Sequence, residues 1–388
     1  MRYRLGILGL AVIALASIAG AGSRSAPKIA AMSVATFASA RQGDAQTEQR
    51  DDRGGAGTIA GLRHLSVVGS TQLIVDGAGH TQSVDANPYG VIVVPAGVGT
   101  GHGLAAGDLL VTNIGGEDQG TTVARFPASQ GPGHLFNVQA DNATLGPANV
   151  VVDAGRSAVW VSNATGNNLQ VFSAGGAVLA TIQDAHLNHP WGLATNLGGE
   201  DAPAAPAVFT SNVADATIER VVPRAGTTGT AYTVTPIGRL GMAGDKTKIG
   251  LAWVPRATVK GRAMADVLFA VDPATNGVVA YPNASTAGPA GAGITVFRGR
   301  PVNLPNEVAV NPLNGDLIIT DLNDNNLVEV SPANGRVVGT RQVDNAPVDL
   351  QTGNGSALLG LAATTDGHGN LVVYFADDNM NTLNVLSP

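Results

Sequence analysis

The feature that most limits the fold of this chain is a two-part motif that occurs six times between residues 86 and 386. Its first part is a short apolar segment rich in Val, Leu and Ala, introduced by a small or polar residue. The six copies start at Gly90, Asn149, Gly192, Gly250, Glu307 and Gly360. Proline stands just before four of them, at Pro88, Pro147, Pro190 and Pro305. Continuous apolar character is typical of strands packed on both sides, so we expect these segments to lie near a central axis, where small side chains relieve crowding.

The second part is a strand that ends in Asn or Asp, followed six residues later by an aliphatic residue that begins another strand. The strand-ending residues are Asn163, Asn212, Asp272, Asp321 and Asp377, and an earlier copy at Asn113 has a turn four residues longer. Asn, Asp and Gly tolerate left-handed backbone geometry and cap turns with their side chains, so each copy predicts a β-hairpin. A further strand often follows, as at 178–181, 294–297 and 337–340.

Each unit therefore contains an inner strand, two middle strands and usually an outer strand. Four-stranded units with a period of about 40–50 residues are typical of a β-propeller. The sequence thus predicts an all-β fold over residues 62–388, a six-bladed β-propeller of four-stranded antiparallel blades. The last unit ends at Pro388 without an outer strand, whereas residues 65–75 have strand-like sequence but no unit. We expect part of this segment to complete the sixth blade and so remove an exposed edge; the alternative is a separate hairpin.

Two of the units resemble the repeats of the NHL family of six-bladed propellers. The closest copy is Pro305–Asn311 followed by Ile319–Leu327, and Ser162–Phe172 is nearly as close. The Arg that is usual before the aliphatic residue is replaced by Asn168 and Asn326. The resemblance therefore implies the fold but no partner bound through that Arg. Because the members of this family include enzymes, ligand binders and interaction domains, the fold alone does not choose a function.

The N-terminus has the pattern of an export signal. Arg2 and Arg4 precede an uncharged stretch of 17 residues, Leu5 to Ala21. Small residues suitable for cleavage stand at Ala19-Gly20-Ala21 and again at Ala38-Ser39-Ala40. The alternative is an uncleaved anchor helix, but a membrane span usually needs about 20 apolar residues.

We therefore expect a cleaved signal peptide over residues 1–21, or as far as residue 40 if the second site is used. Residues 22–61, rich in Ala, Gly, Ser and Gln, predict a flexible linker or tail. The mature protein would be secreted or periplasmic. With no Cys in the chain it is not a lipoprotein, and it has no disulfide, thiolate metal site or Cys nucleophile.

Charge narrows the choice of partners. Only 13% of residues are charged and the formal net charge is −7, whereas nucleic acids and anionic membranes are bound by clustered Lys and Arg. We therefore expect a monomer that binds a protein or small-molecule ligand. No nucleophile elbow, phosphate loop or His-Glu-x-x-His motif occurs, and no residue is identified as catalytic.

In a propeller, the segments that enter the inner strands surround the mouth of the central channel. The residues at these entries are Asn87, Tyr89, Asn149, His189, Trp191, Lys248, Asn306 and Glu307. Four of them, Asn149, His189, Asn306 and Glu307, could hold a divalent cation such as calcium or zinc. This arrangement resembles that of metal-dependent propeller lactonases and lyases. Only Glu307 is a carboxylate, however, and hard-cation sites normally use two or more, so we favour capping and turn roles.

Three further features have both a functional and a structural interpretation. Asp321–Asn326 has oxygens at alternate positions, like a calcium loop, but lacks the Gly and the bidentate Glu of such loops. It coincides with a hairpin turn, as does Asp377–Asn379, so we favour a turn role for both. His186 and His189 are spaced for joint ligation or acid–base work, although two His in a surface loop usually have neither role.

The leading hypothesis is an exported propeller that serves as a binding or scaffold module, with its ligand or partner at the mouth. The alternative is a metal-dependent propeller hydrolase or lyase similar to the lactonases.

Overall fold

The computed structural model describes residues 57–98, 103–129, 131–137, 143–197, 206–223, 231–241, 248–286, 293–350 and 354–388. These residues form strands and three short 3₁₀ helices: η1 (Ile59–Gly61) before the first strand, and η2 (Gly116–Asp118) and η3 (Ala154–Arg156) between strands. The expected signal peptide over 1–21 and the expected linker as far as residue 56 lie outside the described residues. Across the described part of the chain, no helix has the length and apolar character that a membrane crossing requires.

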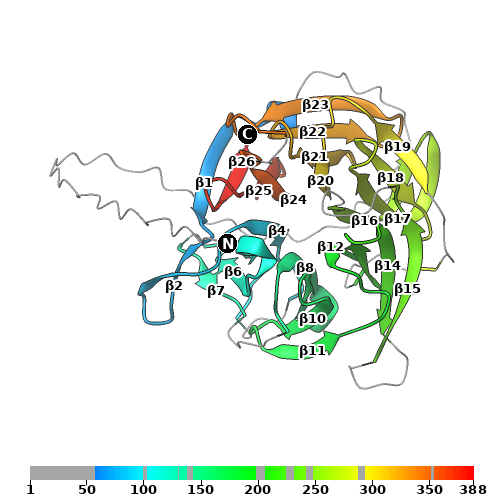
Figure 1. The fold of residues 1–388 in the computed structure, drawn as a ribbon. Coiled ribbons are helices and arrows are strands. Elements are labelled where there is room, and N and C mark those ends of the chain that lie inside the picture. Colours follow the sequence, from blue (N-terminus) through cyan, green and yellow to red (C-terminus); the bar gives the residue numbers. More distant parts are fainter. Residues whose placement is uncertain are drawn as a thin grey trace, which may run out of the picture. The chain divides into compact units, whose positions relative to one another are not determined.

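The fold is a six-bladed β-propeller, as the sequence predicts (Figure 1). From the axis outward, the first three blades contain β4 (Pro88–Val93), β5 (Leu109–Asn113), β6 (Thr122–Phe126) and β7 (His134–Leu135); β8 (Pro147–Asp153), β9 (Ala158–Asn163), β10 (Asn168–Ser173) and β11 (Val178–Ile182); and β12 (Pro190–Thr195), β13 (Val208–Asn212), β14 (Thr217–Pro223) and β15 (Tyr232–Arg239).

Blades 4 to 6 have the same order. They contain β16 (Leu251–Val259), β17 (Arg262–Asp272), β18 (Gly277–Tyr281) and β19 (Ile294–Arg298); β20 (Pro305–Val310), β21 (Leu317–Asp321), β22 (Asn326–Ser331) and β23 (Arg336–Gln342); and β24 (Leu358–Thr365), β25 (Leu371–Asp377), β26 (Thr382–Ser387) and β1 (His64–Ser70).

Strand β1 closes the ring. It pairs antiparallel with β26, from His64 opposite Ser387 to Ser70 opposite Thr382, and so supplies the outer strand of blade 6. This confirms the expected joining of the two chain ends. The chain then adds β2 (Leu73–Val75) and β3 (Thr81–Ser83) to blade 1, which becomes a six-stranded sheet. The outer strand β7 has only two residues and would leave most of the edge of that blade unpaired. Strands β2 and β3 extend the sheet at this edge.

The segment before β1 differs from the expected linker in its last residues, 57–61. Ile59 and Leu62 are fully buried, and the Ile59 N–H donates to Oε2 of Glu329 at 2.9 Å. The Asn311 side-chain amide donates to the Gly57 carbonyl oxygen at 2.9 Å. Residues 57–61 are therefore part of the folded domain, because two apolar side chains and two hydrogen bonds hold η1 against blade 5.

The inner strands approach one another too closely for side chains at four positions. A Cβ on Gly360 of blade 6 would lie 1.7 Å from the Tyr89 carbonyl oxygen of blade 1. A Cβ on Gly192 would lie 2.1 Å from the Ile249 carbonyl oxygen of the next blade. The glycines that begin the inner-strand motif are thus required by packing between blades, which confirms the expected crowding at the axis.

A hydroxyl group on the second strand of four blades ties neighbouring blades together. Ser211 accepts a hydrogen bond from the Gly192 N–H at 2.9 Å and donates to the Ile249 carbonyl oxygen at 2.6 Å. Thr112, Ser162 and Thr320 make the same two contacts in their own blades. The hydroxyl comes directly before the strand-ending Asn or Asp, so the recurrent motif contains a contact between blades as well as a turn.

The predicted hairpin turns are present. The residue just before or at the start of the third strand has a positive φ near 50° at Asn167, Asn276, Asn325 and Asn381, and in blade 3 Ala216 has φ 57°. Asn325 also donates to the Gly355 carbonyl oxygen at 2.8 Å and accepts from the Ala357 N–H at 2.8 Å. Asparagine at this position therefore supplies left-handed geometry and a bond to the next blade.

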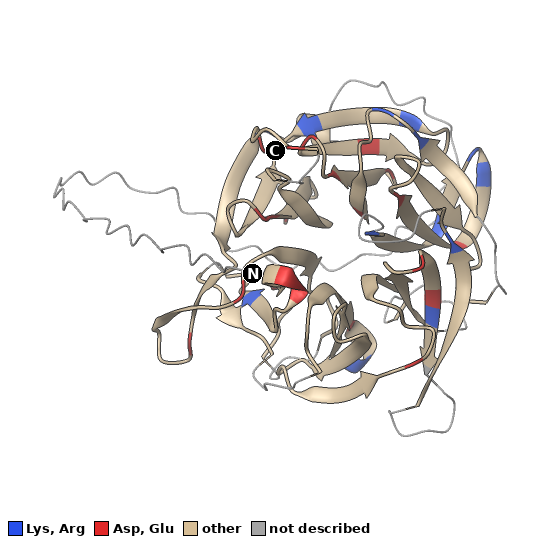
Figure 2. Ribbon diagram, in the orientation of Figure 1, with Lys and Arg blue, Asp and Glu red and all other residues tan. Residues whose placement is uncertain are grey.

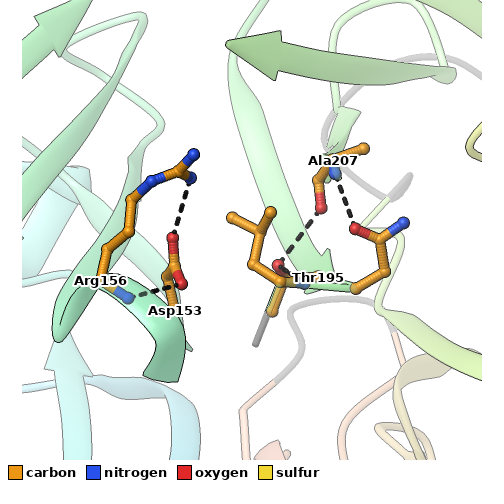
Figure 3. A network of polar contacts seen from close by, with 6 residues as sticks. Asp153, Arg156, Thr195 and Ala207 are labelled. Carbon is orange, nitrogen blue, oxygen red and sulfur yellow. Dashed lines mark hydrogen bonds and ion pairs between the residues drawn. The ribbon is translucent and has the colours of Figure 1, made fainter. Parts of the chain in front are cut away.

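Polar contacts hold the connections between first and second strands (Figure 3). In blade 2, Oδ1 of Asp153 caps η3 by accepting from the Arg156 N–H at 3.1 Å, and its Oδ2 pairs with Nη1 of Arg156 at 3.2 Å. In blade 3, the Thr195 hydroxyl donates to the Ala207 carbonyl oxygen at 3.2 Å. Acidic residues on the described ribbon lie mainly at turns and strand ends (Figure 2).

Candidate functional site at the mouth of the channel

The register of the strands defines one face of the propeller. Pro147 stands opposite Asn163, Pro190 opposite Asn212 and Pro305 opposite Asp321. The start of each inner strand therefore lies beside the end of the second strand, so the entries and the hairpin turns share a face, which we call the mouth face.

Two rings of residues lie where the inner strands begin. The upper ring contains Tyr89, Ala148, Trp191, Ile249, Asn306 and Leu359. The lower ring, one residue further along each strand, contains Gly90, Asn149, Gly192, Gly250, Glu307 and Gly360. Four of the six positions in the lower ring are glycine, so Asn149 and Glu307 provide the side chains at that level.

Asn149 and Glu307 contact each other across the axis. Asn149 belongs to blade 2 and Glu307 to blade 5, which is the opposite blade in a ring of six. Nδ2 of Asn149 donates to Oε2 of Glu307 at 2.7 Å, and both residues are 6% exposed. The pair therefore occupies the axis at the level of the lower ring, and the sequence prediction brings together two of its four metal candidates.

The carboxyl group of Glu307 is buried and closely surrounded by neighbouring atoms. Its Oε1 accepts the Val308 N–H at 3.1 Å, and a Cβ on Gly250 would lie 2.2 Å from the same oxygen. Burial raises the pKa of Glu307 to about 8, against the opposing effect of hydrogen bonds from Val308, Asn149 and the Leu251 backbone. Because the effect of burial dominates, the Glu307 carboxyl group is protonated in a substantial fraction of the molecules near neutral pH.

Asn306 faces blade 6. Its Nδ2 donates to the Leu359 carbonyl oxygen at 3.0 Å, and its backbone oxygen accepts the Gly250 N–H at 2.9 Å. Its Oδ1 is buried and has no hydrogen-bond partner. Asn306 thus links three blades and leaves one acceptor unused.

A second group of side chains, which we call the mouth cluster, consists of Tyr89, His189, Trp191 and Lys248. The rings of Tyr89 and Trp191 meet edge to face with centroids 5.0 Å apart, and the His189 ring stacks on Trp191 at 6.1 Å. Nζ of Lys248 donates to the Tyr89 hydroxyl oxygen at 2.5 Å. It lies 4.8 Å from the centre of the Tyr89 ring and 4.9 Å from that of Trp191.

The mouth cluster is a charged group on an apolar base. Tyr89 and Trp191 are buried, whereas Lys248 and His189 are half-buried. Burial raises the pKa of Tyr89, and the nearby Lys248 charge acts against this increase. Burial also raises the pKa of Asp378 to about 6; Lys248 opposes the shift and Asp377 adds to it.

Sequence reasoning placed Lys248 at a strand entry but did not select it as a site residue. The equivalent position, two residues before the lower ring, is Pro in four blades and Leu358 in the sixth. A lysine in place of the proline is the only charged residue at this register. The signal is a departure from the repeat, which only an alignment of the six copies can show.

The His residues considered as metal ligands do not meet the Asn149–Glu307 pair in one group. His189 belongs to the mouth cluster, whereas Nδ1 of His186 contacts Oδ1 of Asp184 at 2.8 Å in an exposed position. Over the described residues, no three His, Asp or Glu side chains form a group that could hold a metal ion. Asn149 and Glu307 are bonded to each other, and Glu307 is the one carboxylate of the predicted set.

A separate cavity of about 510 Å³ lies between blades 5 and 6. It is lined by Gln342–Ala346, Gly355, Asp377, Asn379 and Met380. Nδ2 of Asn379 donates to Oδ2 of Asp344 and to the Gly355 carbonyl oxygen, both at 3.0 Å. Oδ1 of Asp377 accepts the Met380 N–H at 3.1 Å, which is the turn contact expected of this segment.

Comparison with known proteins finds similarity to solved structures but not to sequences. No family model matches the chain and no curated protein sequence matches it. A solved structure of a Bacteroides thetaiotaomicron protein of unknown function has a TM-score of 0.54 at 14% identity, over 83% of this chain and 75% of that chain. A gluconolactonase from Xanthomonas campestris has a TM-score of 0.49 at 13% identity, over 78% and 87%. A streptogramin B lyase has a TM-score of 0.46 at 14% identity, over 81% and 85%. At these identities the similarity concerns the fold alone.

Proposed function

We propose that this protein is a binding module that takes a small ligand with an anionic group at the mouth face. The observation that carries the proposal is the position of Lys248, whose ammonium group lies over the Tyr89 and Trp191 rings. The hydrogen-bond partner of this ammonium group is a neutral phenol hydroxyl. A ligand anion would give Lys248 an opposite charge at hydrogen-bonding distance.

The energetics of the mouth cluster favour this role. A cation over an aromatic ring gains about 0.5–2 kcal/mol, whereas removal from water costs an ammonium group considerably more unless an anion compensates it. Asp378 acts on Lys248 through its charge and, with a pKa of about 6, is largely ionised at neutral pH. Among the described residues, however, the hydrogen bond of Nζ goes to the Tyr89 hydroxyl and not to this carboxylate. A ligand carboxylate or phosphate would therefore improve the environment of Lys248, and an aromatic part would pack beside His189 and Trp191.

The lower ring supports the same interpretation. The Asn149–Glu307 pair fills the axis directly beneath the upper ring. A ligand on the mouth cluster would therefore rest on this pair and would not pass through the propeller.

The experiment uses benzoate as a planar anionic probe and benzamide as its neutral counterpart. We expect benzoate to change tryptophan fluorescence saturably in the wild type and in Lys260→Met, an exposed lysine in the β16–β17 turn. Lys248→Met should abolish the change, and benzamide should bind much more weakly. Equal responses of the two lysine variants, or equal binding of the two probes, would contradict a role for Lys248.

We further propose that the protein is exported and is related to the NHL-repeat propellers. Arg2, Arg4 and the apolar stretch to Ala21 support export, and the units around Asn163 and Asp321 support the kinship. Expression of the full chain in a bacterial host should yield mature protein outside the cytoplasm, with an N-terminus after Ala21 or Ala40. Recovery of protein that still begins at Met1 would contradict cleavage.

The competing function is a metal-dependent hydrolase or lyase of the lactonase type. It is favoured by the buried carboxyl group of Glu307 at the axis and by the unpaired Oδ1 of Asn306. Turnover of lactones or esters that Glu307→Ala abolishes, together with stoichiometric metal by elemental analysis, would support it. Absence of both in the wild type would leave the binding function.

A further inference from the structure

We infer that the β21–β22 hairpin of blade 5 binds a hard divalent cation, best matched by Ca²⁺, through the carboxylates of Asp321 and Asp324. This site is distinct from the mouth cluster and from the Asn149–Glu307 pair. The sequence marks the hairpin only as a turn with several oxygen-bearing side chains, and the structure shows which of those oxygens remain without a partner.

Three carboxylate oxygens in this hairpin are buried and have no hydrogen-bond partner. They are both oxygens of Asp321, which is 0% exposed, and Oδ1 of Asp324. A buried carboxylate without a compensating donor is strongly unfavourable. Two such side chains in one turn therefore need either a proton or a cation in their neighbourhood.

The equivalent residues of blades 3 and 4 have partners on both polar atoms of the side chain. In blades 1 and 2 the Oδ1 atoms of Asn113 and Asn163 are also buried without a partner, but they belong to neutral amides whose Nδ2 groups donate hydrogen bonds. In blade 4, Asp272 accepts from the Ala274 N–H at 3.2 Å and from the Thr275 hydroxyl at 2.6 Å. In blade 3, Asn212 accepts from the Asn188 N–H at 3.0 Å and donates to the His186 carbonyl oxygen at 2.7 Å. The same position of the repeat is thus satisfied by either residue type when the loop provides the right groups.

In blade 5 the corresponding loop residue is Asn303, which stands two residues before Pro305 as Asn188 does before Pro190. The backbone N–H of Asn303 lowers the pKa of Asp321 but completes no hydrogen bond to either oxygen. An aspartate also has no N–H with which to make the second contact of Asn212. The substitution therefore places a buried carboxyl group with two unpaired oxygens where asparagine is neutral and donates through its Nδ2 group.

The two carboxylates share one neighbourhood. Asn303 is 7% exposed and its Nδ2 donates to Oδ2 of Asp324 at 3.2 Å, while its backbone faces Asp321. Nη1 of the exposed Arg300 lies 3.6 Å from the same Asp324 oxygen. Two carboxylates against one guanidinium leave a net charge of −1 when all three are ionised, and the partly exposed Asp324 provides access from solvent.

The donor set favours Ca²⁺ among common cations. Hard cations prefer oxygen ligands, and Ca²⁺ accepts six to eight of them in irregular geometry, with water completing the shell. Mg²⁺ demands a near-ideal octahedron, and zinc prefers imidazole or thiolate. The unpaired oxygens of Asp321 and Asp324 are the oxygen ligands that the hairpin offers.

The decisive variant is Asp321→Asn, because asparagine is the residue that the repeat itself uses at Asn163 and Asn212. We expect equilibrium dialysis of the wild type against ⁴⁵Ca²⁺ to show one bound ion per chain, and the melting temperature to rise with CaCl₂ concentration. Asp321→Asn should fold, lose the bound ion and melt at the same temperature with and without CaCl₂. Asp324→Asn should bind about tenfold or more weakly.

Two control variants separate this site from other acidic groups. Asp272→Asn changes the same repeat position in blade 4, where both oxygens already have partners, and should bind Ca²⁺ as the wild type does. Glu307→Gln changes the carboxyl group at the axis and should also retain the ion. Loss of binding in Glu307→Gln with retention in Asp321→Asn would place the metal at the axis and overturn the inference.

Two other results would also overturn the inference. Wild-type protein that binds no Ca²⁺ at millimolar concentration, while Asp321→Asn is more stable than wild type at pH 8, would show that a proton serves the buried carboxyl group and would overturn the site. An increase in melting temperature that MgCl₂ matches at equal concentration would overturn the choice of Ca²⁺.

Discussion

Asn149 and Glu307 join opposite blades of the propeller through one hydrogen bond of 2.7 Å between Nδ2 and Oε2. The four glycines of the lower ring make this contact possible, since a side chain on Gly250 would collide with the Glu307 carboxyl group. The bond lies directly beneath the mouth cluster, so the base of the proposed ligand site is also a structural link across the axis.

The buried Glu307 predicts a specific dependence of stability on pH. Its pKa is raised to about 8 in the folded state from an ordinary value of 4.5. Between these values the folded state holds more protons than the unfolded state, so the free energy of unfolding falls as pH rises from about 4.5 to about 8. The loss should be on the order of a few kcal/mol and level off above pH 8.

Urea denaturation from pH 5 to pH 9 measures this effect, with Glu307→Gln as the reference that cannot titrate. We expect the stability of the wild type relative to Glu307→Gln to decrease with rising pH over this range. Asp321 and Glu219 also have raised pKa values, about 8 and about 7, and contribute with the same sign to both proteins. A constant difference between the two proteins would contradict the assigned pKa of Glu307.

Gly360→Ala should severely destabilise the propeller. A Cβ at this position would lie 1.7 Å from the Tyr89 carbonyl oxygen, so the inner strands of blades 6 and 1 would have to separate. We expect a loss of more than about 3 kcal/mol by chemical denaturation, or failure to fold. Gly77→Ala is the matched control, because a Cβ there meets nothing within 4 Å; comparable losses in both variants would rule out the packing explanation.

Ser211→Ala should cost about 1–3 kcal/mol, because it removes a hydroxyl that binds both the Gly192 N–H and the Ile249 carbonyl oxygen. The variant leaves a buried donor and a buried acceptor without their shared partner. Ser83→Ala in the exposed strand β3 is the control, with an expected change within about 0.5 kcal/mol. Thermal or urea unfolding compares the two, and a neutral Ser211→Ala would show that the hydroxyl contacts between blades are dispensable.

Deletion of residues 64–70 should abolish a single cooperative melting transition. It removes β1, leaves the edge of β26 unpaired and opens the ring at blade 6. Deletion of residues 77–79, the turn between β2 and β3, is a control of similar kind that leaves the six four-stranded blades intact. Differential scanning calorimetry should show a much larger loss for the first deletion; equal effects would argue against closure by β1.

Much of the fold could be predicted because the information repeats. The continuous apolar strand that begins at Glu307 and the turn after Asp321 each have counterparts in the other blades, so a period and a strand number can be counted. The joining of the chain ends followed from an outer strand missing at one end and an unassigned strand at the other. The burial of Ile59 could not be predicted, because isolated aliphatic residues in a Gly- and Ala-rich stretch do not show which surface will cover them.

The candidate site was predicted less completely. Tyr89, Trp191 and His189 were expected at the mouth and lie together there, and Asn149 meets Glu307 as a pair. The role of Lys248 depends on a contact between blades 1 and 4, which no local pattern contains.

The sequence by itself determined the blades of this protein, because the apolar strand segments, the turn residues and their period are local properties that recur six times. Only the tertiary structure decided which side chains meet at the axis and which buried oxygens lack a partner. Those relationships join residues up to 159 positions apart, such as Tyr89 and Lys248. They depend on the closure of the ring, because the distances between side chains of different blades are fixed only when all six blades are packed together.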